Sequence, residues 1–265
     1  MINHLKQATL NEIFKMIKHK TTYVYIVFVL VAVIASSFGI KFIEGTNNAN
    51  NGYSFIVFSL QTLSTTILPF ILLMFATNTI SSEKASGTIR NILVSGCSKN
   101  QFILSKLISS FVFLLLLMII AAIAAIIIGS MLFGFGTLSE DGLVIVTQHQ
   151  FWSLFLISYV TLAIVLFAGI SFGIMISTIT QTTISAIAIA IGSYIMLEGI
   201  KTKLHIENFI YSSYIEFPLD RISNMVEGFP ITWAPKVYYC FIISVLWIFI
   251  TSVISLIAMK NSEFK

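Results

Sequence analysis

The stretch 102–133 reads FILSKLISSFVFLLLLMIIAAIAAIIIGSMLF, and one charged residue, Lys106, interrupts it near its start. A run of about 20 apolar residues is enough for a helix to cross the hydrocarbon of a bilayer. Further apolar stretches of this kind lie at 23–40, 55–80, 151–176, 184–197 and 237–259. The sequence therefore predicts an all-α membrane protein with six transmembrane helices.

The composition agrees with this prediction. Of the 265 residues, 57% are hydrophobic and only 10% are charged, whereas a soluble domain carries roughly 25% charged residues. We therefore expect membrane lipid to be part of the solvent, and we expect residues 21–265 to form a single transmembrane domain. The net charge of +4 is explained by loops on the cytoplasmic side, so we expect no nucleic-acid partner.

The positions of the basic residues predict the orientation of the chain. Lysine and arginine are concentrated in the N-terminal segment, in the loop after the second span and at the C-terminus. By the positive-inside rule, these three regions face the cytoplasm. We expect a multi-pass protein of the cell membrane with both termini cytoplasmic. Its richness in Ile, Asn, Lys and Phe fits an AT-rich bacterial genome.

Residues 1–20 are expected to form a separate element. Apolar residues recur there at spacings of three and four, at Leu5, Ile13, Met16 and Ile17, with lysines off that face. This pattern is typical of a basic amphipathic helix that lies on the cytoplasmic leaflet. A disordered basic tail is the alternative.

The loop after the second span carries most of the functional information. Residues 81–101 read SSEKASGTIRNILVSGCSKNQ. Gly87 offers a break in the helix, and Ser98 can cap the third span. The residues between them predict a short amphipathic helix in the cytoplasm, which is a suitable docking surface for a partner.

This loop also resembles a known signature. Glu83-x-x-x-Gly87-Thr88-Ile89, followed by Leu93, Ser98-Lys99 and Lys106, is similar to the motif of ABC-2 type transporter permeases. These proteins are the membrane subunits of ATP-driven exporters, and the resemblance extends loosely over the six spans. It implies that the loop is a coupling helix that packs on an ATPase subunit. The positions that match this role are Glu83, Gly87, Thr88, Ile89, Arg90 and Leu93.

The resemblance also implies the partners. Two permease subunits, identical or paralogous, would pair and bind two copies of an ABC ATPase. The chain contains no G-x-x-x-x-G-K-[ST] phosphate loop, so ATP and Mg would be bound by the ATPase. We expect no catalytic residue, cofactor or metal in the chain itself. The cargo implied is hydrophobic or amphipathic, such as a peptide, an antibiotic or a lipid.

The second span suggests a translocation pathway because its first half is unusually polar. Gln61, Thr62 and Thr65 precede Pro69, which favours a kink. Polar groups within hydrocarbon seek partners or a wet cavity, so these residues are candidates to face the pathway. The alternative is that the hydroxyls bond their own backbone and hold helices together.

The segment 199–236 is predicted to lie outside the cell. It contains apolar patches, and the resemblance implies short re-entrant helices near the outer exit, with Glu198, Lys201 and Lys203 at the rim. An ordinary surface loop is the alternative.

Two other functions compete with export. The pattern Gly169-Ile-Ser171-Phe-Gly173 fits a hydrolase nucleophile elbow, but it lies within an apolar span, where the two glycines favour close helix packing. An ATP-independent secondary transporter or channel is the stronger alternative. Ion-coupled transport often uses buried carboxylates, and the centres of the predicted spans contain none.

Overall fold

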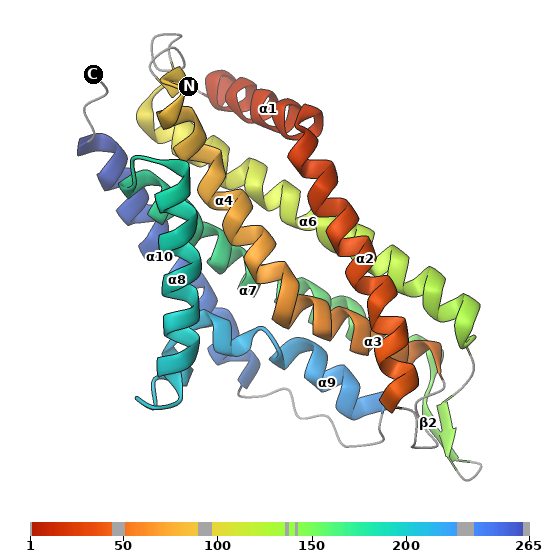
Figure 1. Cartoon of the computed structure of the whole chain (residues 1–265). Coiled ribbons are helices and arrows are strands. Elements are labelled where there is room, and N and C mark those ends of the chain that lie inside the picture. The colour runs from red at the N-terminus through yellow and green to blue at the C-terminus, as the bar shows by residue number, and fades with distance from the viewer. Residues whose placement is uncertain are drawn as a thin grey trace.

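The computed structural model describes residues 2–43, 51–89, 97–135, 138–140, 143–226 and 236–261. Within these residues, six helices are long and apolar enough to cross a membrane, which confirms the predicted count. The second crossing, Gly52–Ala85, is formed by α3 and α4 together. Figure 1 shows the crossings side by side as one bundle. Their bounds are α2 Lys20–Ile43, α3 Gly52–Thr62, α4 Leu68–Ala85, α6 Lys99–Leu132, α7 Gln148–Ile179, α8 Thr183–Lys201 and α10 Lys236–Asn261.

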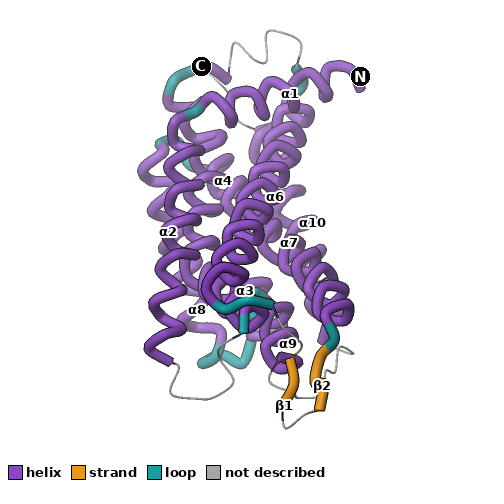
Figure 2. Tube along the Cα trace, turned by 90° about the vertical axis from the view of Figure 1, so that its right-hand side faces the viewer, coloured by secondary structure: helices purple, strands orange, loops and turns teal. Residues whose placement is uncertain are grey.

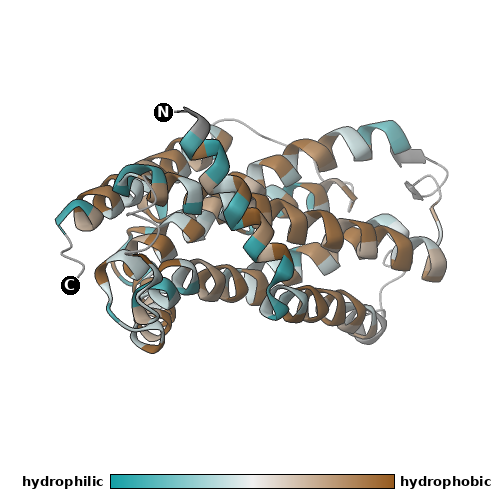
Figure 3. Cartoon of the chain, turned by 90° about the horizontal axis from the view of Figure 1, so that it is seen from above, coloured by the Kyte–Doolittle hydropathy of each residue, from teal (hydrophilic) through white to brown (hydrophobic). Residues whose placement is uncertain are grey.

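A shorter helix precedes the bundle. Helix α1, Ile2–Lys18, lies across one end of the spans and packs against α6 (Figure 2). Seen from that end, α1 mixes hydrophilic and hydrophobic residues, whereas hydrophobic residues dominate the long helices (Figure 3). The two chain termini also lie at this end of the bundle (Figure 1).

Two long helices begin at capping boxes. The side chain of Ser98 accepts the backbone N–H of Gln101, and the Gln101 side chain accepts the N–H of Ser98. Thr147 and Gln150 make the same reciprocal pair at the start of α7. Each pair satisfies two backbone donors that the helix leaves without an internal partner. The predicted capping role of Ser98 is thereby confirmed.

The second crossing contains a local irregularity beside Pro69. A π-helical turn, Leu63–Ile67, joins α3 to α4 immediately before this proline. Proline has no backbone N–H and crowds the carbonyl four residues earlier, so the regular hydrogen-bond ladder cannot continue through it. The irregularity takes the form of a single widened turn, which is how the rare π-helix usually occurs inside α-helices.

Helix α7 holds the bundle together through contacts with α4 and α10. A Cβ atom on Gly173 would lie 2.8 Å from the Cβ of Ala76 in α4, so the two helices pack too closely for a side chain there. The hydroxyl of Ser177 accepts the backbone N–H of Ser81 at 2.9 Å and donates to the carbonyl of Thr77. The packing interpretation of Gly173 is confirmed.

The opposite end of the bundle contains elements that the all-α prediction did not include. Within the described residues, β1 Leu138–Glu140 and β2 Leu143–Val146 form an antiparallel pair. Strands this short leave no clear alternation in the sequence, which explains why they were not predicted. After α8 come two 3₁₀ turns, Glu207–Phe209 and Tyr211–Tyr214, and the helix α9, Phe217–Val226, which packs on α3 and α7.

Candidate functional site

The candidate site lies where α1 crosses the ends of α4 and α6. On α4, the residues Phe75, Asn78, Thr79, Ser82 and Glu83 line one pocket. Their spacings of three and four place them on one face of the helix. On α1, a face of the same spacing is formed by Glu12, Lys15 and Met16. His19 directly follows this helix, and α6 supplies Lys106 and Ser109. Helix periodicity in three segments thus brings polar residues to one place.

Four charged side chains form a closed network at this site. The ammonium of Lys106 lies 2.5 Å from Oε2 of Glu12 and 2.8 Å from Oε1 of Glu83. The ammonium of Lys15 lies 2.9 Å from Oε1 of Glu12 and 2.9 Å from Oε1 of Glu83. Two lysines therefore bridge the same two carboxylates, and the four formal charges cancel. The network ties α1, α4 and α6 together.

The two lysines differ sharply in exposure. The side chain of Lys106 is only 2% exposed, whereas that of Lys15 is 53% exposed. Removing an ammonium group from water costs several kcal/mol unless partners compensate for it. Lys106 therefore depends on its two carboxylate partners, while Lys15 retains contact with water.

Burial and charge act in opposite directions on the pKa values of the α1 residues. Burial raises the pKa of Glu12, but Lys106 and Lys15 together lower it by more, so it lies below its ordinary value of 4.5. Burial lowers the pKa of Lys15, but Glu12 and Glu83 raise it by more, so it lies above 10.5. At neutral pH both groups are therefore charged.

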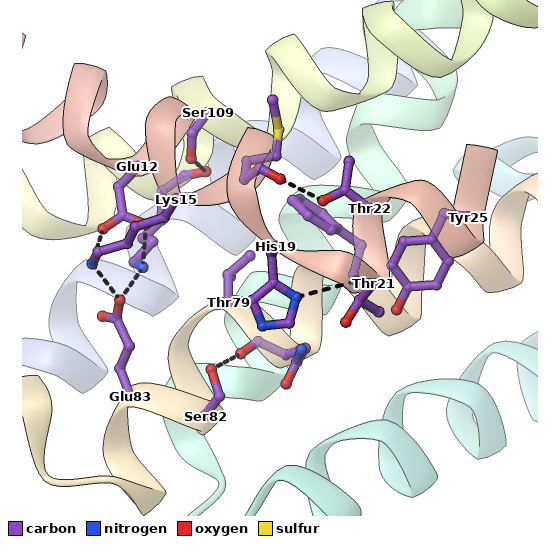
Figure 4. Close-up of a pocket in the computed structure, with 14 residues that line it drawn as sticks. Glu12, Lys15, His19, Thr21, Thr22, Tyr25, Thr79, Ser82, Glu83 and Ser109 are labelled. Atoms are coloured by element: carbon purple, nitrogen blue, oxygen red, sulfur yellow. Dashed lines mark hydrogen bonds and ion pairs between the residues drawn. The ribbon is translucent and has the colours of Figure 1, made fainter.

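A cavity of about 150 Å³ adjoins the network. Figure 4 shows Glu12, Lys15 and Glu83 pointing toward one another on one side of it, with His19, Thr21 and Tyr25 on the other. The ring of Tyr25 packs edge-on against Phe75, with centroids 6.4 Å apart. The cavity therefore has a charged side and an aromatic side.

The structure places the predicted coupling residues around the end of α4. Glu83 lies within the last turn of this helix and points into the ion network. Gly87 has a φ of 69°, which confirms the predicted break in the helix. The hydroxyl of Thr88 donates to the carbonyl of Glu83 at 3.3 Å, and Ile89 is buried. Arg90 and Leu93 lie outside the described residues.

The predicted pathway residues surround the π-helical turn. Gln61, Thr62 and Thr65 are half-buried, and Pro69 is buried. The hydroxyl of Thr65 donates to the carbonyl of Gln61 at 3.0 Å, and Thr66 donates to Thr62 at 2.6 Å. Both hydroxyls thus donate to backbone carbonyls one turn earlier in the same crossing. This is the arrangement expected if these side chains serve helix packing and do not line a pathway. A pathway role for these residues stays a prediction.

The predicted rim residues lie at the opposite end of the bundle. Lys201 and Glu198 form an ion pair at 2.6 Å, and the hydroxyl of Ser212 donates to Glu198. Lys203 is exposed. These residues do not meet the ion network at the other end.

The segment after α8 packs against the bundle. The indole N–H of Trp247, near the middle of α10, donates to the carbonyl of Phe209 at 2.8 Å. The buried ring of Tyr211 covers Gly169 of α7. A membrane-inserted position for residues 199–236 stays a prediction, and residues 227–235 lie outside the described part.

Sequence reasoning missed Glu12 and Lys15 as site residues and treated Lys106 only as part of the motif. One signal was available, because Lys106 interrupts a long apolar run and a charge within hydrocarbon requires a partner. Another was that Glu12 is the only acidic residue in the segment 1–20. The periodicity places Glu12 on the same face as Leu5 and Met16, so its carboxylate points toward the bundle.

Residues 23–264 match a family described as "Protein of unknown function (DUF2705)". The chain belongs to the DUF2705 family. Within the matched region of this DUF2705 protein lie Glu83 and Lys106, whereas Glu12 and Lys15 on α1 precede it. No curated protein shows significant similarity to the chain.

Proposed function

We propose that this chain is the membrane-spanning permease subunit of an ATP-driven ABC exporter of the ABC-2 type. The observation that carries the proposal is the position of Glu83. It lies at the end of the second crossing, bonded to Lys106 and Lys15, and the left-handed Gly87 follows it. A force applied to the segment after α4 would therefore reach α1 and α6 through charged contacts. This is the connection that a coupling segment requires.

The energy source is assigned to a separate subunit. Because the chain contains no phosphate loop of the usual form, an ABC ATPase would bind ATP and Mg. Two ATPase copies would act on two permease subunits, as a homodimer or a paralogous pair. The residues proposed to contact the ATPase are Gly87, Thr88, Arg90 and Leu93. Ile89, which is buried in the core, would anchor this segment to the bundle, and Glu83 would transmit the movement inward.

The orientation is proposed from charge and from α1. The end that carries α1 and both termini is assigned to the cytoplasm by the positive-inside rule. On α1, Leu10, Phe14 and Ile17 are 54%, 57% and 49% exposed, and the ammonium of Lys18 lies 4.4 Å from the Phe14 ring centroid. An exposed apolar face flanked by lysines favours a helix that lies in the cytoplasmic membrane surface.

The cargo is proposed to be hydrophobic or amphipathic. Gln61, Thr62 and Thr65 remain partly exposed beside the π-helical turn, where they would face the pathway between two subunits. Glu198, Lys201 and Lys203 would form the outer rim. The 3₁₀ turns and α9 would form a re-entrant segment close to the exit, supported by the bond between Trp247 and Phe209.

Site-specific crosslinking to the ATPase tests this proposal. The chain is expressed with the ABC ATPase encoded beside it, with Cys97→Ser and Cys240→Ala as background. Thr88→Cys should crosslink to a cysteine placed in the ATPase, and the two proteins should co-purify. The matched control is Glu207→Cys, an exposed position at the opposite end, which should not crosslink. A chain that co-purifies with no ATPase, or that crosslinks equally from both positions, would contradict the proposal.

The ATP-independent alternative makes a different prediction. Export by a secondary transporter would continue in vesicles that lack ATP and would stop when the ion gradient is collapsed. Export by the proposed complex would require ATP and would tolerate an uncoupler.

A further inference from the structure

The cavity beside the ion network has the size of a small headgroup. Its volume of about 150 Å³, at roughly 10–15 Å³ per water molecule on the same measure, has room for about ten water molecules. A whole lipid or peptide cannot enter such a space. A compact polar group can enter it while an attached apolar chain stays outside.

Four of the hydroxyl groups that line the cavity already donate their proton to a backbone carbonyl. Thr22 donates to the carbonyl of Met16 at 2.6 Å, and Thr79 donates to that of Ala76 at 2.7 Å. Ser82 and Ser109 likewise donate to backbone carbonyls, at 2.5 Å and 3.1 Å. A hydroxyl has a single proton to donate. Each of the four therefore presents lone pairs to anything that enters the cavity.

The carboxylate of Glu83 adds an acceptor of higher charge. Its Oε1 accepts from both lysines, whereas its Oε2 is buried and has no hydrogen-bond partner among the residues that the structure describes. A buried acceptor without a partner destabilises the folded chain, and more so when the acceptor is charged. A hydrogen-bond donor next to Glu83 would remove this cost.

Lys15 occupies the position that a second ammonium group could take. It bridges Glu12 and Glu83 while its side chain is 53% exposed, so its long stem can turn toward water. Lys106, at 2% exposure, has no such freedom. If Lys15 left the network, two carboxylates would remain with one ammonium. The resulting negative charge favours a cation and disfavours an anion.

The aromatic side of the cavity suits the same kind of ligand. Tyr25 and Phe75 line the cavity, and Phe75 stacks on Phe113 with centroids 3.7 Å apart, which fixes its ring. Aromatic faces attract ammonium groups and also pack against the first carbons of an alkyl chain. An ammonium group carried on an apolar chain matches both sides.

We propose that this cavity binds the primary ammonium headgroup of an amphiphile, which Glu83 receives in exchange for Lys15. The inference deepens the proposed function, because it assigns the chemistry of a cargo headgroup at the α1 end of the bundle. The binding itself needs no ATPase. The source of the headgroup is either a resident aminolipid or a diffusible cationic amphiphile.

Binding of octylammonium to the purified full-length chain tests the proposal. Octanol and octyl sulfate are the neutral and anionic probes of the same chain length, and isothermal titration calorimetry in nonionic detergent measures each affinity. Octylammonium should bind at one site, with an affinity at least about tenfold higher than that of either control. A tenfold difference is what one hydrogen bond to a charged group contributes. Equal affinity for octylammonium and octanol would overturn the proposal.

Two substitutions should change the affinity for octylammonium in opposite directions. Glu83→Gln should weaken binding about tenfold, whereas Lys15→Met should strengthen it about threefold, because an exposed ion pair no longer has to be broken. Lys15 is half exposed, so its variant stays informative even if Glu83→Gln fails to fold. Glu207→Gln, at the other end, is the carboxylate control and should leave affinity unchanged. Weaker binding by Lys15→Met would contradict the exchange.

A second experiment, with lipids, identifies the source of the headgroup. The chain is reconstituted in nanodiscs of phosphatidylethanolamine and phosphatidylcholine in equal parts, and native mass spectrometry counts the lipids retained. Selective retention of phosphatidylethanolamine, lost in Glu83→Gln, assigns the site to a resident lipid. Binding of octylammonium without lipid selectivity assigns it to a diffusible amphiphile. If the chain binds octylammonium but no ATPase, only the proposed exporter function is overturned. If it binds the ATPase but not octylammonium, only the proposed headgroup site is overturned.

Discussion

The ammonium of Lys106 lies 2.8 Å from Oε1 of Glu83, although the two residues belong to different spans. Lys106 enters from the second turn of α6, and Glu83 from the last turn of α4. Glu12 on α1 provides the second carboxylate for the same ammonium. One buried cation thus contacts carboxylates of two other helices at this end of the bundle.

Replacement of Lys106 should destabilise the chain strongly. Lys106→Met leaves Glu12 and Glu83 with only the exposed Lys15, and breaking a buried ion pair from one side costs about 3–5 kcal/mol. We expect a large drop in the thermal midpoint measured in detergent by fluorescence-detected size exclusion. Lys201→Met removes the more exposed pair with Glu198 and should cost about 1 kcal/mol or less. Similar thermal midpoints for the two variants would show that the ion pairs of Lys106 do not stabilise the chain more than the ion pair of Lys201 does.

The stability supplied by α1 should depend on pH at both extremes. The pKa of Glu12 is lowered on folding, so its contribution is complete above about pH 4.5 and is lost as pH falls through the lowered pKa. The pKa of Lys15 is raised, so its contribution is complete below about pH 10.5 and is lost as pH rises through the raised pKa.

Thermal midpoints measured across this pH range check that expectation. The contribution of Glu12 and Lys15 to the midpoint should be constant between about pH 5 and 10 and should fall on either side. Glu12→Gln should lower the plateau and remove much of the acid-side fall, and Lys15→Met should do the same on the alkaline side. If the midpoint of Glu12→Gln falls as steeply at low pH as that of the wild type, the acid sensitivity belongs to other groups.

Gly173 should tolerate no side chain, in contrast to Gly192. A Cβ on Gly173 would meet the Cβ of Ala76 at 2.8 Å, so Gly173→Ala must separate α7 from α4, at a cost of about 1–3 kcal/mol. Among the described residues, no atom lies within 4 Å of the same position on Gly192 of α8, so Gly192→Ala should be neutral or slightly stabilising. Thermal unfolding of the two variants measures the difference, and equal losses would refute the close packing of α4 and α7.

The pathway hypothesis rests mainly on Gln61. The hydroxyl of Thr65 already donates to the carbonyl of Gln61, so Thr65 has no proton left for a passing cargo. Gln61→Leu with Thr65→Leu should reduce cargo export several-fold in cells, while Thr65→Val alone should have little effect. Normal membrane expression is the control for folding. Unchanged export by the double variant would exclude a pathway role and leave helix packing as the function of these polar residues.

Several features could be read from local sequence, because each depends on a short segment. The long apolar run 102–133 requires a spanning helix, and Ser98 with Gln101 marks where that helix begins. Gly87 marks where the preceding helix ends. Segments too short or too irregular for a pattern, such as β1, β2 and the 3₁₀ turns, could not be predicted in this way.

The sequence by itself determined that this chain crosses a membrane, how many times, and where polar residues interrupt the apolar runs, because hydrophobicity and helix periodicity are properties of consecutive residues. Only the tertiary structure decided that Lys106 takes both Glu12 and Glu83 as partners. Those pairs join residues 94 and 23 positions apart, and the pairing depends on how α1 lies across the bundle. Ion pairs form between whichever charges packing brings together, and packing is a property of the whole chain.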